Sequence, residues 1–271
     1  MNKGNNKKPG FGNVQVNDLD IFYRRAGDGP PLLFVHGGAG DSRVWTPQME
    51  ALSDAFTVLA WDEPGAGNSS DVPDGFALSD YADCLAGLIT QLDIAPVHLA
   101  GLSWGSTVAL ECYRRHPQLV RTMVIAGGYA GWLGSLGETE TQARLARLRE
   151  MMADPGKRFD PRLPGLFAGD PPPEFVPLLD AMAADVRPRS VQTSLEIMGK
   201  TDLNHVLPAV AVPTLLLWGA LDARSPLRIA REFEQKIPNA LLVVIPGSGH
   251  VVNLQAPGAF NEAVRNFCRA Y

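Results

Sequence analysis

The chain alternates short runs of apolar, mostly β-branched residues with stretches whose apolar positions recur at helical spacing. Short apolar runs predict buried strands, and strands that alternate with helices predict a mostly parallel sheet covered on both faces. Eight strands are expected, at residues 14–16, 21–25, 31–35, 56–61, 96–100, 120–125, 214–218 and 241–245. Four helices are expected around this sheet, at residues 78–92, 103–116, 227–237 and 257–269. The predicted fold class is therefore α/β.

The alternation stops between residues 127 and 207, where no run predicts a strand. Three short amphipathic helices are expected there instead, with apolar positions at 145, 148 and 152, at 175, 178, 179 and 182, and at 191, 195 and 198. A helical block inserted after the sixth strand predicts a cap over the carboxyl edge of the sheet, where ligands bind in open α/β sheets. We therefore divide the chain into a flexible tail (1–12), an α/β core (13–127 and 208–271) and a helical cap (128–207).

Composition and charge narrow the classes of partner. A length of 271 residues suits one large domain with an insertion, and the net charge of −5 argues against a nucleic-acid partner. The longest apolar runs are too short to cross a bilayer, and the polar N-terminal segment lacks the apolar stretch of a secretory signal. We therefore expect a cytoplasmic protein without a membrane partner, whose three cysteines are reduced and buried. The pattern does not predict an oligomeric state.

The clearest chemical signal is the segment GLSWG at residues 101–105, which lies between an apolar strand and a helix. A nucleophile on so sharp a turn needs small neighbours two residues before and two residues after it, and glycine stands at both positions. The turn exposes the hydroxyl of Ser103 above the sheet and directs the positive end of the following helix toward it. Ser103 is therefore the predicted nucleophile of a hydrolase.

A serine nucleophile needs an adjacent base, and that base needs a carboxylate to orient it. His250 stands in the loop after the last strand, at the same sheet edge as Ser103, and is the predicted base. Asp222 follows the preceding strand and is the predicted acid, because no acid stands in the loop at residues 126–131. The alternative role for Asp222 is a cap on the helix that starts near Ser225.

The other four histidines are expected to have other roles. His98 lies within a strand and is expected in the core, and His116 is expected at a helix C-terminus, where its charge is favourable. His205 has no evident partner. His36 is expected to anchor, through its ring, the loop HGGAG at residues 36–40.

Stabilisation of a tetrahedral intermediate requires N–H donors aimed at the substrate oxygen. One donor is expected from Trp104, the residue after the nucleophile, and the other from Gly38 in the loop after the third strand, with Ala39 as the alternative. Glycines let the backbone of this loop approach a substrate closely, so Gly37 and Ala39 are also expected to contact it.

Taken together, these motifs resemble the α/β-hydrolase superfamily over about residues 14–268. The resemblance rests on the HGG loop, the nucleophile elbow, a G-x-x-D loop at 219–222 and a GH pair at 249–250, in that order. It implies acyl transfer through a covalent acyl-enzyme that water then hydrolyses. The chain departs from the family pattern D-x-R-G-x-G-x-S at residues 62–69, where DEPGAGNS lacks the arginine and any salt bridge that depends on it.

The expected substrate is a small-molecule ester or lactone with a hydrophobic portion. Apolar cap residues are expected to line its pocket, namely Trp132, Leu133, Leu136, Phe167, Phe175 and Met182. Arg187 and Arg189 are expected either at a substrate carboxylate or in surface ion pairs, and the second role is favoured.

Other reactions on the same triad stay open. The HGGAG loop also resembles the HGGPG loop of proline iminopeptidases, so amide hydrolysis is an alternative, as is hydrolysis of a C–C bond. From a different class, we consider a ligand-binding protein that keeps the triad but turns over slowly. Haloalkane dehalogenases and epoxide hydrolases of this fold use an aspartate nucleophile, so Ser103 argues against both. Nucleotide, flavin and metal-ligand motifs do not occur, so no cofactor and no metal are expected.

Overall fold

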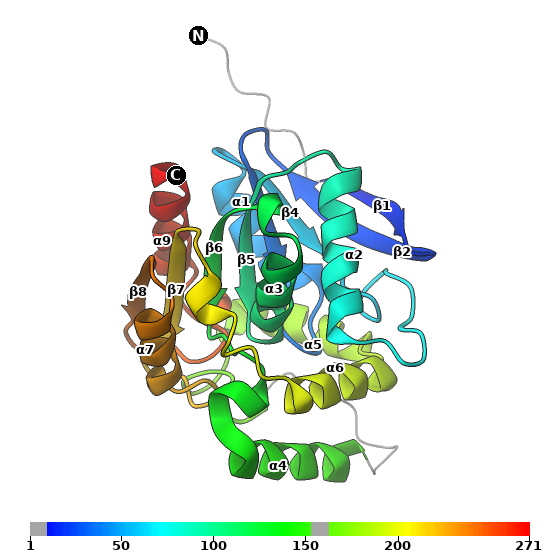
Figure 1. Cartoon of the computed structure of the whole chain (residues 1–271), viewed down its shortest axis with the longest axis vertical. Coiled ribbons are helices and arrows are strands. Elements are labelled where there is room, and N and C mark those ends of the chain that lie inside the picture. The colour runs from blue at the N-terminus through cyan, green and yellow to red at the C-terminus, as the bar shows by residue number, and fades with distance from the viewer. Residues whose placement is uncertain (1–9, 153–162) are drawn as a thin grey trace.

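The computed structural model describes residues 10–152 and 163–271, and these contain one eight-stranded sheet (Figure 1). Its strands are β1 (Gly10–Val16), β2 (Leu19–Ala26), β3 (Pro31–Val35), β4 (Thr57–Trp61), β5 (Val97–Leu102), β6 (Val120–Ala126), β7 (Thr214–Gly219) and β8 (Ala240–Ile245). They lie in the order β1-β2-β4-β3-β5-β6-β7-β8. β2 pairs antiparallel with β1 and β4, and every other neighbouring pair is parallel. The predicted mostly parallel, eight-stranded sheet is confirmed.

Helices cover both faces of this sheet (Figure 1). They are α1 (Thr46–Leu52), α2 (Leu78–Gln91), α3 (Trp104–Arg115), α4 (Trp132–Met152), α5 (Val176–Ala184), α6 (Pro188–Lys200), α7 (Leu227–Lys236), α8 (Val252–Gln255) and α9 (Pro257–Ala270). One apolar cluster joins the sheet to α2, α3 and α7 and includes Tyr81, Val108 and Phe233. A second cluster, on the opposite face, joins it to α1 and α9 and includes Met49 and Phe260.

The burial of the central strands explains their sequences. Every residue of β4, β5 and β7 is buried, because helices cover both sides of these strands. Strands that are buried on both faces have continuous apolar sequences rather than alternating ones, and this pattern made them predictable from the sequence. α7 and α9 pack only one side on the sheet, and their buried residues recur at helical spacing, as at Phe260, Val264 and Phe267.

Three differences from the sequence-based expectation concern element boundaries. β1 begins at Gly10, and residues 10–12 pair with residues 23–25 of β2, so these three residues belong to the sheet and not to a tail. Residues 1–9 lie outside the described residues. α1 and the 3-10 turn Ser42–Trp45 before it were not predicted. α4 begins at Trp132, well before the predicted apolar positions at 145–152, and is interrupted at Gly137, whose φ is +75°.

The described residues between β6 and β7 form helices and 3-10 turns but no strand. α4, α5 and α6 lie at the carboxyl end of the parallel strands, beyond the point where β5 ends at Leu102 (Figure 1). This is the location predicted for a cap, although the division of the chain into core and cap at residues 128 and 207 stays a prediction.

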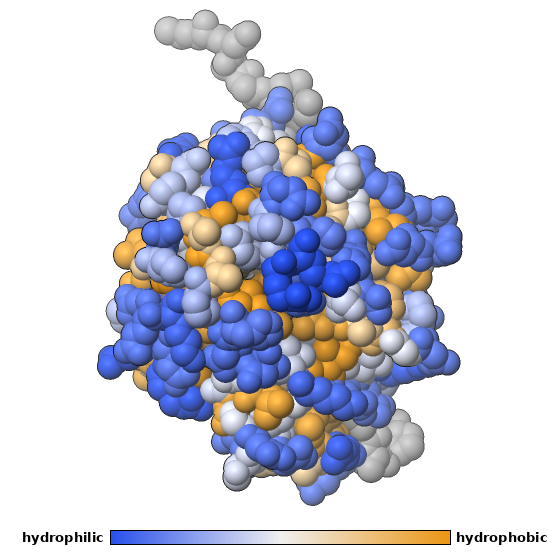
Figure 2. Space-filling model, in the orientation of Figure 1, coloured by the Kyte–Doolittle hydropathy of each residue, from blue (hydrophilic) through white to orange (hydrophobic). Residues whose placement is uncertain are grey.

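Cys84, Cys112 and Cys268 are free and buried, as expected. On the face that α2, α3 and α7 form, hydrophilic residues are interspersed with hydrophobic ones (Figure 2). No helix in the described part of the chain is long and apolar enough to span a bilayer.

Candidate active site

Ser103 occupies a strained turn between β5 and α3. Its φ of 55° and ψ of −116° lie outside the regions that a residue with a side chain normally adopts. A Cβ atom on Gly101 would lie 2.5 Å from the carbonyl oxygen of Gly105, and one on Gly105 would lie 2.3 Å from that of Val35. Both glycines are therefore needed for close backbone contact, which is the physical reason given above for the GLSWG pattern.

Asp222 and His250 form a buried pair at the ends of β7 and β8. Nδ1 of His250 lies 2.9 Å from Oδ2 of Asp222, and their side chains are 4% and 0% exposed. The other carboxylate oxygen of Asp222 accepts hydrogen bonds from the backbone N–H groups of Arg224 (2.8 Å) and Ser225 (2.7 Å). The two roles considered for Asp222 are thus compatible, because each uses a different oxygen atom.

The loop after β6 lies against this pair. Gly127 has a φ of +49°, and a Cβ atom there would lie 3.0 Å from Nδ1 of His250 and 3.1 Å from Oδ2 of Asp222. The N–H of Ser103 donates to the carbonyl of Ala126 (2.9 Å), and the hydroxyl of Ser225 donates to the carbonyl of Gly128 (2.9 Å). The sequence analysis noted only that this loop lacks an acid and missed the steric role of Gly127.

The His250 loop is also fastened to the helical insertion. The side-chain oxygen of Gln255 accepts hydrogen bonds from the N–H groups of Gly249 (2.8 Å) and Ala168 (3.0 Å), and its nitrogen donates to the carbonyl of Ala168 (2.9 Å). The N–H of Val251 donates to the carbonyl of Leu166 (2.9 Å). These hydrogen bonds join the loop that carries the base to residues 166–168 of the insertion.

The ring of His36 anchors the loop after β3, as expected. Its Nε2 accepts a hydrogen bond from the backbone N–H of Glu63 (3.2 Å), which leaves Nδ1 to donate to the carbonyl of Gly37 (2.9 Å). Gly37 and Gly38 lie beside the nucleophile: Cβ atoms placed on them would be 3.4 Å from Cβ of Ser103 and 3.8 Å from Cβ of Trp104. Within the described residues, the N–H groups of Gly38 and Trp104 make no loop hydrogen bond.

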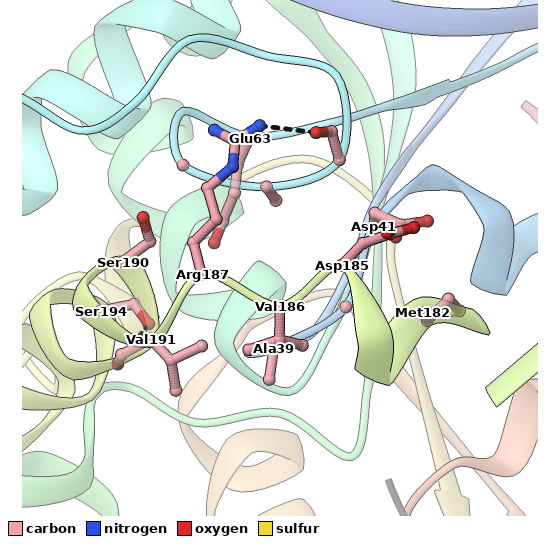
Figure 3. A pocket seen from close by; sticks show the side chains of 14 residues that line it. Ala39, Asp41, Glu63, Met182, Asp185, Val186, Arg187, Ser190, Val191 and Ser194 are labelled. Atoms are coloured by element: carbon pink, nitrogen blue, oxygen red, sulfur yellow. Dashed lines mark hydrogen bonds between the residues drawn. The ribbon is translucent and has the colours of Figure 1, made fainter. Parts of the chain in front are cut away.

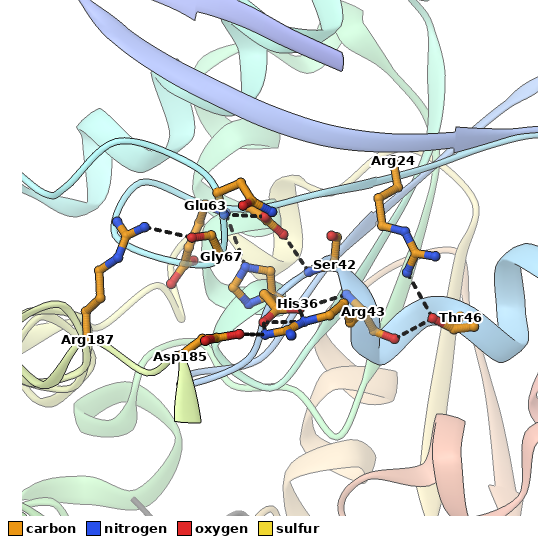
Figure 4. Close-up of polar contacts among 12 residues, drawn as sticks. Arg24, His36, Ser42, Arg43, Thr46, Glu63, Gly67, Asp185 and Arg187 are labelled. Atoms are coloured by element: carbon orange, nitrogen blue, oxygen red, sulfur yellow. Dashed lines mark hydrogen bonds and ion pairs between the residues drawn. The ribbon is translucent and has the colours of Figure 1, made fainter. Parts of the chain in front are cut away.

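Glu63 is a buried acid whose backbone N–H donates to the ring of His36 (Figure 4). Its carboxylate accepts a hydrogen bond from the indole nitrogen of Trp104 at 2.6 Å. Burial raises the pKa of Glu63 to about 7, a rise that His36 and the Trp104 indole N–H oppose and that Asp62 increases. Glu63 stands in the DEPGAGNS segment that departs from the family pattern, and the sequence analysis did not identify it.

The same segment is held by polar contacts from both of its sides. Asp62 accepts hydrogen bonds from the N–H groups of Ser42 (2.7 Å) and Asn68 (2.8 Å). From the start of α6, Arg187 reaches across a small cavity of about 20 Å³ (Figure 3) and donates to the carbonyls of Gly67 (2.7 Å) and Ser69 (2.9 Å). A guanidinium therefore contacts this loop even though the loop itself has no arginine.

Arg187 and Arg189 make the ion pairs that the sequence analysis favoured over a substrate contact. Arg187 pairs with Asp71 at 2.9 Å, and Arg189 pairs with Asp74. A third link between the insertion and the core joins Arg43 to Asp185 at 2.7 Å. Neither Arg187 nor Arg189 lines the large cavity described next.

A cavity of about 680 Å³ lies between the sheet edge and the insertion, and Ser103 and His250 both line it. The predicted substrate contacts Gly37, Gly38, Ala39, Trp104, Trp132, Phe167 and Met182 line it as well. Three other predicted pocket residues do not: Leu133 is largely exposed, and Leu136 and Phe175 pack against the two apolar clusters. The structure also adds residues that were missed, among them Tyr129, Arg144, Arg147 and Arg224.

The remaining histidines lie apart from this cavity. His98 is buried in β5, where its Nδ1 lies 2.8 Å from the hydroxyl of Thr122, which confirms the expected core role. His116 follows the last residue of α3 and contacts Asp83 at 2.8 Å. Among the described residues, no group of three or more His, Cys, Asp or Glu side chains is arranged to hold a metal ion.

Comparisons with known proteins agree with this fold. Residues 30–257 match the family model described as the alpha/beta hydrolase fold. The chain is 27% identical over 264 residues to a 2-(acetamidomethylene)succinate hydrolase of Mesorhizobium japonicum, a match that covers 95% of this chain and 94% of the relative. It is 26% identical to a putative carbamate hydrolase of Azorhizobium caulinodans, over 93% of this chain and 96% of the relative. A malate-bound structure of a thermophilic esterase from Thermogutta terrifontis superposes with a TM-score of 0.83 at 28% identity, over 93% of this chain and 94% of the esterase.

Proposed function

The chain belongs to the α/β-hydrolase family, and on this premise we propose that it is a serine hydrolase of carboxylic esters or lactones with a hydrophobic portion. Ser103 is the nucleophile, His250 the general base and acid, and Asp222 the carboxylate that orients His250. Gly38 and Trp104 supply the N–H groups of the oxyanion hole, and no cofactor or metal takes part.

The reaction proceeds in two half-reactions. The Ser103 oxygen attacks the carbonyl carbon while its proton passes to Nε2 of His250, and the oxyanion that forms accepts hydrogen bonds from the N–H groups of Gly38 and Trp104. Collapse of this intermediate breaks the bond to the leaving oxygen, which takes the proton from His250. Water then attacks the acyl-enzyme and gives a proton to His250. Collapse of the second intermediate breaks the bond to the Ser103 oxygen, which takes this proton back as the acid product leaves.

The observation that carries this proposal is the buried contact between Asp222 and His250, together with a serine of strained backbone angles that lines the same cavity as His250. With Nδ1–H bonded to Asp222, the Nε2 atom of His250 is free to accept a proton. Ser103 and His250 line one cavity, and a cavity of about 680 Å³ is in the size range of small-molecule sites.

Intact-protein mass spectrometry after treatment with a fluorophosphonate tests the proposal. The parent protein should gain the mass of one adduct, and Ser103→Ala should gain none. Ser190→Ala is the matched control, because Ser190 lies on α6 outside the large cavity, and it should label like the parent. An unlabelled parent, or full labelling of Ser103→Ala, would overturn the assignment and favour a ligand-binding protein.

Amide hydrolysis is the second candidate. Two relatives are named for reactions at nitrogen-bearing substrates, a 2-(acetamidomethylene)succinate and a carbamate. Rates on p-nitrophenyl butyrate and on the p-nitroanilide of butyric acid separate the two candidates. We expect the ester to be hydrolysed at least about a hundredfold faster, and comparable rates would favour the amidase.

A further inference from the structure

One wall of the large cavity is lined by arginines. Arg144 and Arg147 come from α4, and Arg224 comes from the loop after β7, two residues beyond Asp222. Glu140, Arg144 and Arg147 are four and three residues apart, so they lie on one face of α4 and all line the cavity. Among the described residues, three guanidinium groups and a single carboxylate, that of Glu140, line this part of the cavity.

Arg144 is held in place by contacts on every side. It donates to Glu140 at 3.1 Å, to the hydroxyl of Tyr129 at 3.1 Å and to the carbonyl of Arg224 at 2.8 Å. Its guanidinium also lies over the rings of Tyr129 and Trp132, 5.9 Å and 5.6 Å from their centres, and only 12% of its side chain is exposed. These contacts fix Arg144 as a support for the loop that carries Arg224.

Arg224 and Arg147 differ from Arg144 because no carboxylate in residues 10–152 or 163–271 forms an ion pair with either of them. Arg224 is half-buried and packs over Gly165. Burial lowers the pKa of Arg224, Arg144 and Arg147 lower it further, and Tyr129 and Asp222 oppose this change. A partly desolvated cation beside two others is unfavourable unless an anion binds to it. Counted over residues 10–152 and 163–271, the arginine-lined wall of the cavity therefore carries more positive than negative charge.

A second part of the cavity lining is apolar. It is formed by α5 and α6, whose lining residues are Leu179, Met182, Ala183, Val191, Leu195 and Met198. A ligand that satisfies both parts of the lining has an apolar portion as well as an anionic group. Among common anionic groups, carboxylate and phosphate fit a guanidinium best, because its N–H donors match two of their oxygen atoms.

We propose that the natural substrate carries a carboxylate in addition to the bond that is cleaved, and that Arg224 and Arg147 bind this carboxylate while Arg144 positions Arg224. The proposal rests on the function proposed above and narrows its substrate class to acidic esters or lactones, such as half-esters of dicarboxylic acids. The apolar wall of α5 and α6 then contacts the remainder of the substrate.

Half-esters and diesters of one dicarboxylic acid test the selectivity. We compare kcat/KM for monomethyl and dimethyl adipate at low salt in the parent, Arg224→Gln, Arg147→Gln and Arg231→Gln. The control, Arg231, lies exposed on α7 outside the cavity, so its substitution changes net charge equally. The parent should favour the half-ester, and each cavity variant should lower the ratio of half-ester to diester at least about tenfold, mainly through KM. Arg231→Gln should keep the parent ratio.

A binding measurement separates this proposal from the hydrolase assignment, because it needs no turnover. Thermal unfolding of Ser103→Ala is followed with increasing adipate, and with inorganic phosphate at equal concentration. Adipate should raise the unfolding temperature in a saturable way, more than phosphate does, and the rise should be lost when Arg224→Gln is added. An equal rise with and without Arg224, a larger rise with phosphate, or a parent that prefers the diester would overturn the proposal even if Ser103 labels as expected.

Discussion

The sheet side of the cavity is built from backbone contacts, whereas the side formed by α4, α5 and α6 is built from side chains. Beside Ser103, glycines at residues 101 and 105 allow backbone atoms to approach so closely that a single Cβ atom would collide, and Gly127 lets the side chains of His250 and Asp222 lie close to the backbone after β6. On the insertion, Arg144 and Arg187 hold distant loops through guanidinium hydrogen bonds. The first arrangement fixes positions for chemistry, and the second fixes where the insertion lies over the cavity.

The largest effect is expected on the sheet side, from Asp222→Asn. An asparagine there cannot hold the Nδ1–H tautomer of His250 as the carboxylate does, so kcat should fall about 10⁴-fold. The measurement is steady-state hydrolysis of p-nitrophenyl butyrate, with Asp202→Asn as the control in an exposed turn. A loss under tenfold would show that another acid orients His250.

A smaller effect is expected from Gly127→Ala. This variant tests whether close packing against Gly127 maintains the contact between Asp222 and His250. The added Cβ atom would press on both His250 and Asp222, so activity should fall about a hundredfold. Gly75→Ala is a matched control, because Gly75 also has a positive φ, +76°, but has nothing within 4 Å of its Cβ position. Both variants should lose about 1 kcal/mol of stability in urea unfolding, and only the first should lose activity. Equal activity in the two would mean that the pair tolerates displacement.

Glu63 lies between the two regions of the molecule. It stands in the loop after β4 on the sheet side, and it lines the small cavity that Arg187 crosses from the insertion. Its pKa is raised from 4.5 to about 7 by burial, so the folded protein binds a proton that the unfolded chain releases between these values. The stability that Glu63 contributes is therefore complete below pH 4.5 and is lost as the pH rises through 7, a change of about 3 kcal/mol.

Unfolding free energies of the parent and Glu63→Gln between pH 4.5 and 8 measure this change. The difference between the two proteins should move in favour of the variant as the pH rises, since glutamine keeps an acceptor for the Trp104 indole but does not ionise. Glu232→Gln, a substitution on the exposed side of α7, should track the parent. Parallel curves for parent and Glu63→Gln would show that Glu63 does not titrate in this range.

The smallest effect is expected on the insertion, from Arg187→Gln. Loss of its hydrogen bonds to the carbonyls of Gly67 and Ser69 should lower the unfolding free energy by about 1 kcal/mol. Arg189→Gln removes a more exposed ion pair and should change stability by less than about 0.5 kcal/mol. If the two variants behave alike in thermal unfolding, Arg187 is not an anchor of the insertion.

Much of the sheet and the candidate triad could be predicted because each rests on short-range patterns. β3 was predicted at its observed bounds, and the other seven strands were predicted within a few residues. Ser103, Asp222 and His250 follow strands, and strands in a parallel sheet end at one edge. The short helix α1 was missed because seven residues after a loop are too few to show a helical period.

The sequence by itself determined the sheet, the strained position of Ser103 and the chain order of the predicted triad, because neighbouring residues decide local backbone conformation. Only the tertiary structure decided that Arg187 holds the loop after β4, that Glu63 is buried against Trp104, and that Arg144, Arg147 and Arg224 share one wall. These contacts join residues that are 41 to 120 positions apart, as with Trp104 and Glu63 or Arg187 and Gly67. Their geometry depends on how the helices pack, which no local pattern of residues encodes.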